Sequence, residues 1–400
     1  MSVLIAILGL GLLVLVHEAG HFFTALGVGM RPRSFNLGFG PPLVKVSRGG
    51  VDYALRIIPL GGYVKIPGMH RPAPSDAEVY FGPALRKAPT LVGPVERLKR
   101  ALAAGDHDRA LAELDEVEGA AASAGVAGST ERGVRELRDT LGRDAYWRQR
   151  TWRKIVVIFA GPAVNFLLAV VLFAVVFMAA GGKATSTVAE ILPGHPAQAA
   201  GLEPGDRIVA INGIPVRGTG IVHRVSSSEG RPLVLTVARD GRLVKLRPVR
   251  PQQKDGVYRL GFRLQGAHLA AGESSWESLK LTGVVSRETI KSLGGIVHKK
   301  GRDQLASPVG IVRESAAQAR NGWEDYLLVL GFISLSLALL NMLPLLPLDG
   351  GHIAFSIVEG LRGRAVGREV YERVSAIGLA VVLLLFFVGL SNDVGRIGGG

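Results

Sequence analysis

Two histidines and a glutamate, His17, Glu18 and His21, stand within a long apolar stretch near the start of this chain. Residues 3–16 before them carry no charge, and the chain stays mostly apolar after them as far as Leu26. Ionisable groups are costly in a bilayer, so those found inside membrane-spanning helices usually have a function. The motif therefore predicts a functional site within a membrane span.

The spacing of the two histidines indicates a metal ion. Residues four apart on a helix lie on one face, so His17 and His21 can direct imidazole nitrogens at one ion. The nitrogen–metal distance typical of zinc is about 2.0–2.1 Å. Glu18 is rotated by about 100° from His17, which places it beside the ion as a general base and not as a ligand. The alternative, two polar residues packed on an ordinary helix, is disfavoured by the membrane setting.

Asp349 is the predicted third ligand. The chain has no cysteine, so any metal must be bound by His, Asp or Glu. Asp349 follows an apolar segment whose two prolines should break the helix, and Gly350 and Gly351 should free the backbone there. At about 1.5 Å per helical residue, His17 and Asp349 reach a similar depth in the membrane. Three protein ligands and an open fourth position are typical of catalytic zinc, and an ordinary turn or cap aspartate is the alternative.

Four segments are long and apolar enough to span a membrane. The chain has 400 residues, 48% of them apolar, and a mean hydropathy of +0.29, so it has room for a water-exposed domain as well. We expect the spans at residues 3–27, 154–180, 326–346 and 373–391. The sequence thus predicts a multi-pass α-helical membrane protein with the lipid bilayer as a partner.

Many of the basic residues behind the net charge of +14 lie beside span ends, so this charge does not indicate nucleic-acid binding. By the positive-inside rule the N-terminus is outside, residues 28–153 are cytoplasmic and residues 181–325 are outside. We expect the protein to lie in the inner (plasma) membrane, with its metal site towards the cytoplasmic side. The basic residues on which this orientation rests are Arg31, Arg33, Arg148, Arg150, Arg153, Lys154, Arg362, Arg364, Arg368 and Arg373.

Three segments between the spans have recognisable patterns. Residues 35–66 alternate between apolar and polar positions and contain glycine pairs, which predicts short strands. Residues 85–145 show helical periodicity with a glycine-rich break near residues 125–133, which predicts two amphipathic helices; a solvated insertion is favoured over a partner-binding module. Residues 266–325 include an amphipathic stretch that contains Trp276 and ends in Lys299, Lys300 and Arg302, and a helix lying on the membrane surface is expected.

With these motifs the sequence resembles the bacterial site-2 proteases, the RseP-type intramembrane zinc metalloproteases of the M50 family. The resemblance covers nearly the whole chain, and an insertion longer than usual at residues 85–145 is the clearest departure. The motifs that carry it are HEAGH at 17–21, GFGP at 38–41, PLGGYV at 59–64, AGPAVNF at 160–166, SPVGI at 307–311 and LDG at 348–350.

The resemblance implies a protease that cleaves the transmembrane segments of single-span membrane proteins, such as anti-sigma factors or remnant signal peptides. It also implies a membrane-associated β-hairpin-like element, here residues 35–66, that presents the substrate as an extended strand. The runs at residues 191–202 and 205–213 resemble a PDZ domain, with a hairpin turn at Asp240-Gly241. Such an α+β domain can bind peptide termini and is expected to filter substrates outside the cytoplasm; a purely structural role is the alternative.

The expected organisation has six parts. They are residues 1–84, the first span with the zinc motif and the membrane-associated β region; 85–147, a cytoplasmic helical insertion; 148–182, the second span; 183–266, the PDZ domain; 267–325, an extracytoplasmic amphipathic segment; and 326–400, the third and fourth spans with the third zinc ligand.

The predicted reaction is peptide-bond hydrolysis by a Zn²⁺ site. His17, His21 and Asp349 bind the ion, and Glu18 takes a proton from water and returns it to the leaving amine. Asn341 and Asn165 are amides in apolar spans, where they hold the substrate backbone or oxyanion or else join helices. A membrane metal transporter and a catalytically inactive PDZ-bearing receptor are the alternative functions, but neither needs Glu18 as a base.

Overall fold

The computed structural model describes residues 1–181, 183–254, 257–295, 307–363, 366 and 368–398. Four helices in this part of the chain are long and apolar enough to cross a membrane, which confirms the prediction of a multi-pass α-helical membrane protein. They are Ser2–Gly27, Thr151–Gly181, Trp323–Asn341 and Val370–Gly395.

The chain divides into two compact units. Unit 1 contains Met1–Leu168, Ser286–Asn321 and Phe332–Gly400. Unit 2 contains Ala169–Val285 and Gly322–Gly331. The helix α6, Thr151–Val176, and the helix α12, Trp323–Asn341, each contribute residues to both units.

The first membrane helix of unit 1, α1 (Ser2–Gly27), turns one stripe of residues towards the protein. Gly9, Leu13, His17 and Gly20 are all buried and follow one another three or four positions apart, which is the spacing of a single helix face. Leu4, Leu8, Leu12 and Leu15 are instead exposed in the structure, as suits side chains that face lipid. His17 is therefore carried on the packed face of α1.

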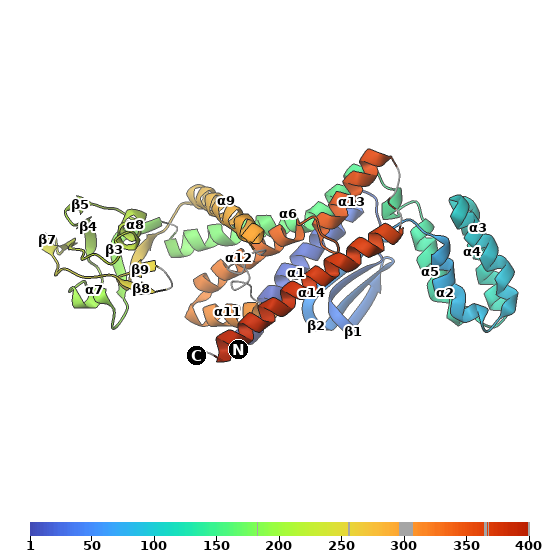
Figure 1. Ribbon diagram of the computed structural model, residues 1–400, viewed down its shortest axis with the longest axis horizontal. Helices are drawn as coiled ribbons and strands as arrows, with labels where there is room; N and C mark the ends of the chain where they lie inside the picture. Colours follow the sequence, from blue (N-terminus) through green and yellow to red (C-terminus); the bar gives the residue numbers. More distant parts are fainter. Residues whose placement is uncertain (182, 255–256, 296–306, 364–365, 367, 399–400) are drawn as a thin grey trace. The chain divides into compact units, whose positions relative to one another are not determined.

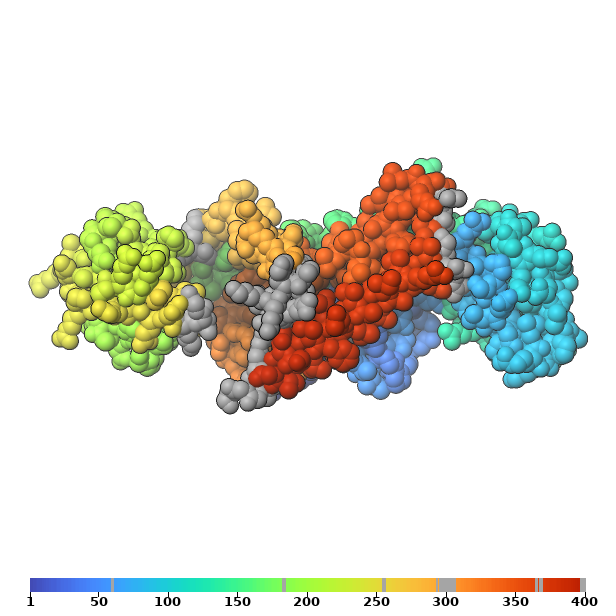
Figure 2. Space-filling view, in the orientation of Figure 1, coloured from blue at the N-terminus to red at the C-terminus, as the bar shows by residue number. Residues whose placement is uncertain are grey.

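The helix α11, Pro308–Asn321, packs against α1 and against α14, Arg368–Gly398. Its start is fixed by Asp393 of α14, whose Oδ2 accepts hydrogen bonds from the Ser307 backbone N–H (2.8 Å) and hydroxyl (2.6 Å). The helix α11, in the last part of the predicted amphipathic segment, is therefore an integral part of the helix packing. The preceding helix α9, Ala271–Gly295, does expose Trp276, and Lys299, Lys300 and Arg302 lie outside the described residues. Figure 2 shows α14 as a continuous red ridge at the surface of unit 1.

Residues 35–66 form two strands that are longer than predicted: β1, Ser34–Arg48, and β2, Val51–Lys65. The turn between them is made by Gly49 and Gly50, both at positive φ (61° and 79°), where glycine is favoured. Residues 34–37 have partners on both sides, residues 52–55 in the same order and residues 62–65 in the opposite order, while residues 44–48 pair with residues 51–55. The pairing thus falls into the short segments 34–37, 44–48, 51–55 and 62–65, which agrees with the prediction of short strands, although β1 and β2 are each 15 residues long. Both strands lie beside α1 (Figure 1).

The insertion contains three helices after residue 85, not two. The periodicity of the sequence did not reveal the boundary between the first and second of these helices. The first ends at Gly105, which adopts a left-handed conformation (φ 70°), and Asp106 caps the second by accepting a hydrogen bond from the Arg109 N–H at 3.0 Å. The predicted glycine-rich break is present at Gly125 (φ 69°), between the second and third of these helices, whereas Gly128 and Gly133 lie inside the third. With the helix just before them these helices form a bundle; they are α2, Pro74–Leu85, α3, Val92–Ala104, α4, His107–Ser123, and α5, Ala127–Leu141.

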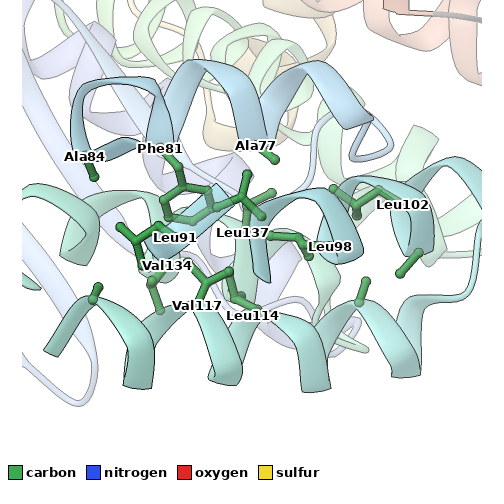
Figure 3. Close-up of a cluster of buried hydrophobic side chains, with 14 of the residues drawn as sticks. Ala77, Phe81, Ala84, Leu91, Leu98, Leu102, Leu114, Val117, Val134 and Leu137 are labelled. Carbon is green, nitrogen blue, oxygen red and sulfur yellow. The ribbon is translucent and has the colours of Figure 1, made fainter. Parts of the chain in front are cut away.

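This bundle has its own hydrophobic core (Figure 3). Phe81, Leu98, Leu114 and Leu137, one from each helix, are at most 1% exposed. A glycine at position 133 is required where α5 crosses α2, because a Cβ there would lie 2.7 Å from the Cβ of Tyr80. The insertion and the helix before it thus form a packed helical bundle.

Unit 2 is built around a mixed layer of strands and short helices. The sheet order is β10-β3-β4-β6-β7, with β5 paired to β4, and Val188, Ile208, Ile211, Leu235 and Val237 fill its core. The predicted hairpin at Asp240-Gly241 is present, with both residues at positive φ (49° and 77°). The strands are β3, Lys183–Ile191, β4, Arg207–Ile211, β5, Ile214–Pro215, β6, Leu235–Arg239, β7, Arg242–Lys245, β8, Gln252–Lys254, β9, Val257–Arg259, and β10, Phe262–Ala267; the helices are α7, Pro196–Ala199, and α8, Thr219–Ser226.

An ion pair joins Asp206, the residue before β4, to Arg239 of β6 in this unit. Asp206 accepts from Arg239 Nε and Nη2, both at 2.7 Å, and its side chain is 1% exposed. Burial alone would raise the pKa of Asp206, but Arg239 and the Glu203 backbone N–H together hold its pKa below the ordinary value. The carboxylate form is therefore the one that stabilises the folded unit.

We expect the substitution Asp206→Asn to loosen unit 2, because it removes the buried counter-ion of the Arg239 guanidinium and leaves only the exposed Glu203 as its partner. Amide hydrogen exchange of β4 and β6 at neutral pH should quicken by about 30-fold, which corresponds to about 2 kcal/mol. Since the folded pKa is lowered, the stabilisation is present above the unfolded pKa of about 4 and is lost as the pH falls through the folded value. The difference from wild type should therefore shrink below about pH 4. Asp240→Asn in the exposed turn is the matched control, and equal exchange in both variants would contradict the prediction.

Candidate metal centre

Three side chains from α1 and α13 (Asp349–Arg362) converge in unit 1. Asp349 Oδ2 lies 3.2 Å from His17 Nε2 and 3.4 Å from His21 Nε2, and the two imidazole Nε2 atoms are 3.2 Å apart. Both histidines are buried, at 9% and 7% exposed. Two residues of the first predicted span and one residue that follows the third are thus brought within reach of a single ion.

The donor atoms fit a divalent cation. His21 Nδ1 lies 2.9 Å from the Val157 carbonyl oxygen of α6, to which it can donate, and this leaves Nε2 with its lone pair directed towards the cluster. Asp349 Oδ2 is buried and has no hydrogen-bond partner. A buried carboxylate oxygen facing two imidazole nitrogens without a hydrogen bond is the arrangement that a metal ion would satisfy.

Asn165 of α6 also reaches this cluster. Its Nδ2 lies 3.4 Å from His17 Nδ1, and its Oδ1 is buried without a hydrogen-bond partner. The Asn165 backbone carbonyl accepts from the Ser334 hydroxyl of α12 at 2.8 Å. Asn165 and Asn341, the last residue of α12, both line the cavity beside the cluster, and Asn165 in addition contacts a histidine.

A sharp turn carries Asp349 to the cluster. The helix α12 ends at Asn341, residues 342–348 turn, and α13 begins at Asp349. Gly350 and Gly351 are needed for a different reason from the one predicted, because both lie within α13 and neither is at positive φ. A Cβ on Gly350 would lie 2.3 Å from the Met342 carbonyl oxygen, and one on Gly351 would lie 2.5 Å from the Leu346 nitrogen. The glycines let α13 pack directly on the turn.

A cavity of about 420 Å³ opens onto the cluster. Glu18 lines it next to the histidines, but its carboxylate is not among the three converging groups. The segment of β2 from Gly61 to Val64 also lines the cavity, and a Cβ on Gly62 would lie 3.0 Å from Glu18 Cγ. A strand edge therefore passes directly beside the glutamate.

His352 lies near this cavity but is held by another group. Its Nδ1 is 3.0 Å from the Tyr371 hydroxyl, and it is not among the residues whose ligand atoms converge. His352 is therefore not placed as a ligand of this cluster.

Gly161 of α6 is a residue that sequence reasoning did not connect to the histidines. A Cβ at this position would lie 2.2 Å from His21 Nε2 and 2.9 Å from His17 Cε1. The small side chains in the AGPAVNF motif were the only available signal, since close helix contacts in membranes favour such residues. The glycine makes room for both imidazole rings.

We expect Gly161→Ala to displace both imidazoles and to lower the rate of peptide hydrolysis by at least about 100-fold, because misplacement by about 1 Å carries a cost of this order. Bound zinc per chain, measured by elemental analysis, should fall in parallel. Gly11→Ala on α1 is the matched control, since no atom lies within 4 Å of its added Cβ. Full activity in the Gly161 variant would contradict the expected crowding.

Two buried imidazoles on a membrane helix, with a glutamate beside them and a carboxylate from a second helix, define a metalloprotease of the membrane. The chain matches the model of peptidase family M50 over residues 5–385, and it belongs to this family. It is a zinc metalloendopeptidase of the site-2 type, which acts within the membrane.

Relatives support this assignment along nearly the whole chain. Zinc metalloprotease RasP of Geobacillus kaustophilus is 31% identical over 98% of this chain and 97% of the relative. A protein of Agrobacterium fabrum named "Putative zinc metalloprotease" is 30% identical over 97% of this chain and 94% of the relative. One of Lactococcus lactis with the same description is 28% identical over 96% of both. These findings favour the protease over the transporter and the inactive receptor.

Proposed function

We propose that His17, His21 and Asp349 bind the catalytic zinc and that Glu18 is the general base. The observation that carries this proposal is the convergence of two imidazole nitrogens and one carboxylate oxygen within 4.8 Å of one another. Zinc bound there would acidify a water molecule and polarise the scissile carbonyl. Glu18 takes the proton of that water and delivers it to the leaving amine.

We propose that Asn165 positions His17 and does not contact the substrate. Its amide can rotate so that Oδ1, which is buried without a partner, accepts from His17 Nδ1–H. That hydrogen bond would leave His17 Nε2 with its lone pair free for the metal, just as the Val157 carbonyl does for His21. The hydrogen bond that joins α6 to α12 at this position is accepted from Ser334 by the Asn165 backbone carbonyl and does not use the side-chain amide.

Asn165→Leu should then weaken zinc binding by about 10- to 100-fold, because losing a group that orients a metal ligand has an effect of this size. Competition with a chromophoric zinc chelator measures the affinity directly. Asn341→Leu should keep the zinc affinity of wild type and lower substrate cleavage instead. If the two variants bound zinc equally well, Asn165 would have no part in holding His17.

The substrate is proposed to be an extended segment of a single-span membrane protein. The edge of β2 at residues 61–64 can add it as a further strand through backbone hydrogen bonds. Asn341, on the same cavity, is placed to hold the substrate backbone or the oxyanion. A substrate strand bound in this way would run past Glu18, and its extended backbone would expose the peptide bonds to attack by water.

The sheet of unit 2 is proposed to be a PDZ domain that filters substrates and can bind peptide termini. Its sheet and the short helix α8 provide the strand-and-helix edge that this mode of recognition uses. We further propose that this domain lies outside the cytoplasm and the metal site towards the cytoplasmic side of the inner membrane. The charge distribution around the spans supports this orientation. The six-part organisation given above remains our proposal for the domain boundaries.

Membrane proteomics tests the proposed reaction in cells. Cells that contain the Glu18→Gln chain should accumulate single-span membrane proteins that cells with the active chain cut within their spans. The accumulated proteins also identify the substrates. Identical membrane proteomes with comparable amounts of both chains would overturn the proposal.

A further inference from the structure

A basic cleft of about 1300 Å³ lies in unit 1, away from the metal cluster, between the β1–β2 hairpin and the helix α5. Eight cationic side chains line it and only three carboxylates, so its wall carries a clear excess of positive charge. None of the residues proposed for catalysis or zinc binding lines it. The proteolytic reaction therefore does not account for this cleft.

Three of the cations already have carboxylate partners. Arg33 contacts Asp139 at 2.8 Å and Asp144 at 3.1 Å, Lys45 contacts Asp52 at 2.9 Å, and Lys65 pairs with Glu136. These pairs use all three carboxylates of the wall. The other cations of the cleft therefore have no carboxylate of the wall to pair with.

Five arginines remain without a carboxylate within ion-pair distance among the residues that the structure describes. Arg56 donates only to neutral groups, Asn36 Oδ1, the Gly40 carbonyl oxygen and the Tyr63 hydroxyl. Arg153 donates to Gln149 Oε1 at 3.2 Å, while its buried Nε has no partner. The five are Arg31, Arg56, Arg135, Arg143 and Arg153. Such a group of guanidinium forks can bind the oxygens of a phosphate.

The cleft lies where two membrane helices end. Leu26 and Gly29, at the end of the span Ser2–Gly27, line it, and so does Arg153, near the start of the span Thr151–Gly181. Span ends lie at the level of lipid headgroups. The cations are therefore placed where a phospholipid presents its phosphate.

The hairpin that forms one wall is amphipathic. Lys45, Asp52 and Arg56 face the cleft, whereas the alternating residues Val46 and Leu55 are 55% and 43% exposed. An exposed apolar face next to a basic cleft suits acyl chains beside a headgroup, and an acidic peptide would need no such face. We propose that this cleft binds the headgroup phosphate of an anionic phospholipid and so fixes the hairpin at the membrane surface.

Lipid titration of the full chain in neutral detergent tests the proposal, with native mass spectrometry counting the complexes. Short-chain phosphatidylglycerol should bind at least about tenfold more tightly than phosphatidylcholine of the same chain length. The double substitution Arg135→Gln with Arg143→Gln should remove about tenfold of the phosphatidylglycerol affinity and leave phosphatidylcholine binding unchanged. Both arginines are exposed, so the fold should be preserved.

Arg100→Gln with Arg132→Gln is the matched control, since both residues are exposed and outside the cleft and the loss of charge is the same. Equal lipid affinity in the two double variants would overturn the proposal, as would equal affinity of wild type for the two lipids. Soluble glycerol phosphate should bind far more weakly than phosphatidylglycerol; equal binding would identify a free phosphate as the ligand and overturn a lipid source. A poly-glutamate peptide that binds where phosphatidylglycerol does not would overturn it in favour of an acidic protein segment. No readout requires proteolysis or zinc.

Discussion

Glu18→Gln should abolish nearly all peptide hydrolysis while the protein keeps its zinc. Glutamine has nearly the same size and shape as glutamate but cannot take a proton from water, and a positioned general base typically contributes about 10²- to 10⁴-fold to the rate. Glu18 lines the cavity beside the histidines but is not one of the three converging groups, so the metal ligands remain in place. Cleavage of a single-span substrate in reconstituted membranes and zinc per chain by elemental analysis measure the two effects separately.

Glu314→Gln on α11 provides the matched control, because Glu314 is exposed and contacts Gln318. It should leave both the rate and the zinc content unchanged. Loss of zinc in the Glu18 variant would make Glu18 a ligand, and retained cleavage would remove it from the mechanism. Either result would contradict the role proposed here.

Asp349→Ala should release the zinc and with it the activity. Asp349 Oδ2 is the one carboxylate oxygen of the cluster and lies within 3.4 Å of both imidazole Nε2 atoms. Loss of a group that only orients a metal ligand lowers the affinity by about 10- to 100-fold. Because Asp349 is itself proposed as a ligand, its loss should lower the zinc affinity by more than this. Zinc affinity and cleavage rate, measured on the same preparation, should decrease together.

His352→Gln distinguishes a ligand from a neighbour in the same helix. His352 lines the cavity, but its Nδ1 lies 3.0 Å from the Tyr371 hydroxyl. This variant should bind zinc as wild type does. If His352→Gln lost zinc and Asp349→Ala kept it, the proposed set of ligands would be wrong.

The sequence determined the local features of this protein. His17, Glu18 and His21 lie on one helix, where the 3.6-residue period fixes their relative directions before any packing occurs. The four apolar segments are likewise set by length and composition, and all four are present as helices. The glycine pair Gly49-Gly50 sets the hairpin turn, although the sequence did not reveal how long the paired strands are.

Only the tertiary structure decided how separate segments meet. Asp349 was expected at a similar depth to His17, but its approach to 3.2 Å depends on the turn after Asn341 and on two glycines that pack without positive φ. The contacts of α6 with the site, through Val157, Gly161 and Asn165, have no sequence period that points to a histidine on another helix. The basic cleft likewise draws its cations from segments that are far apart in the chain. Periodicity fixes directions within one element, whereas distances between elements follow from side-chain packing across the whole fold.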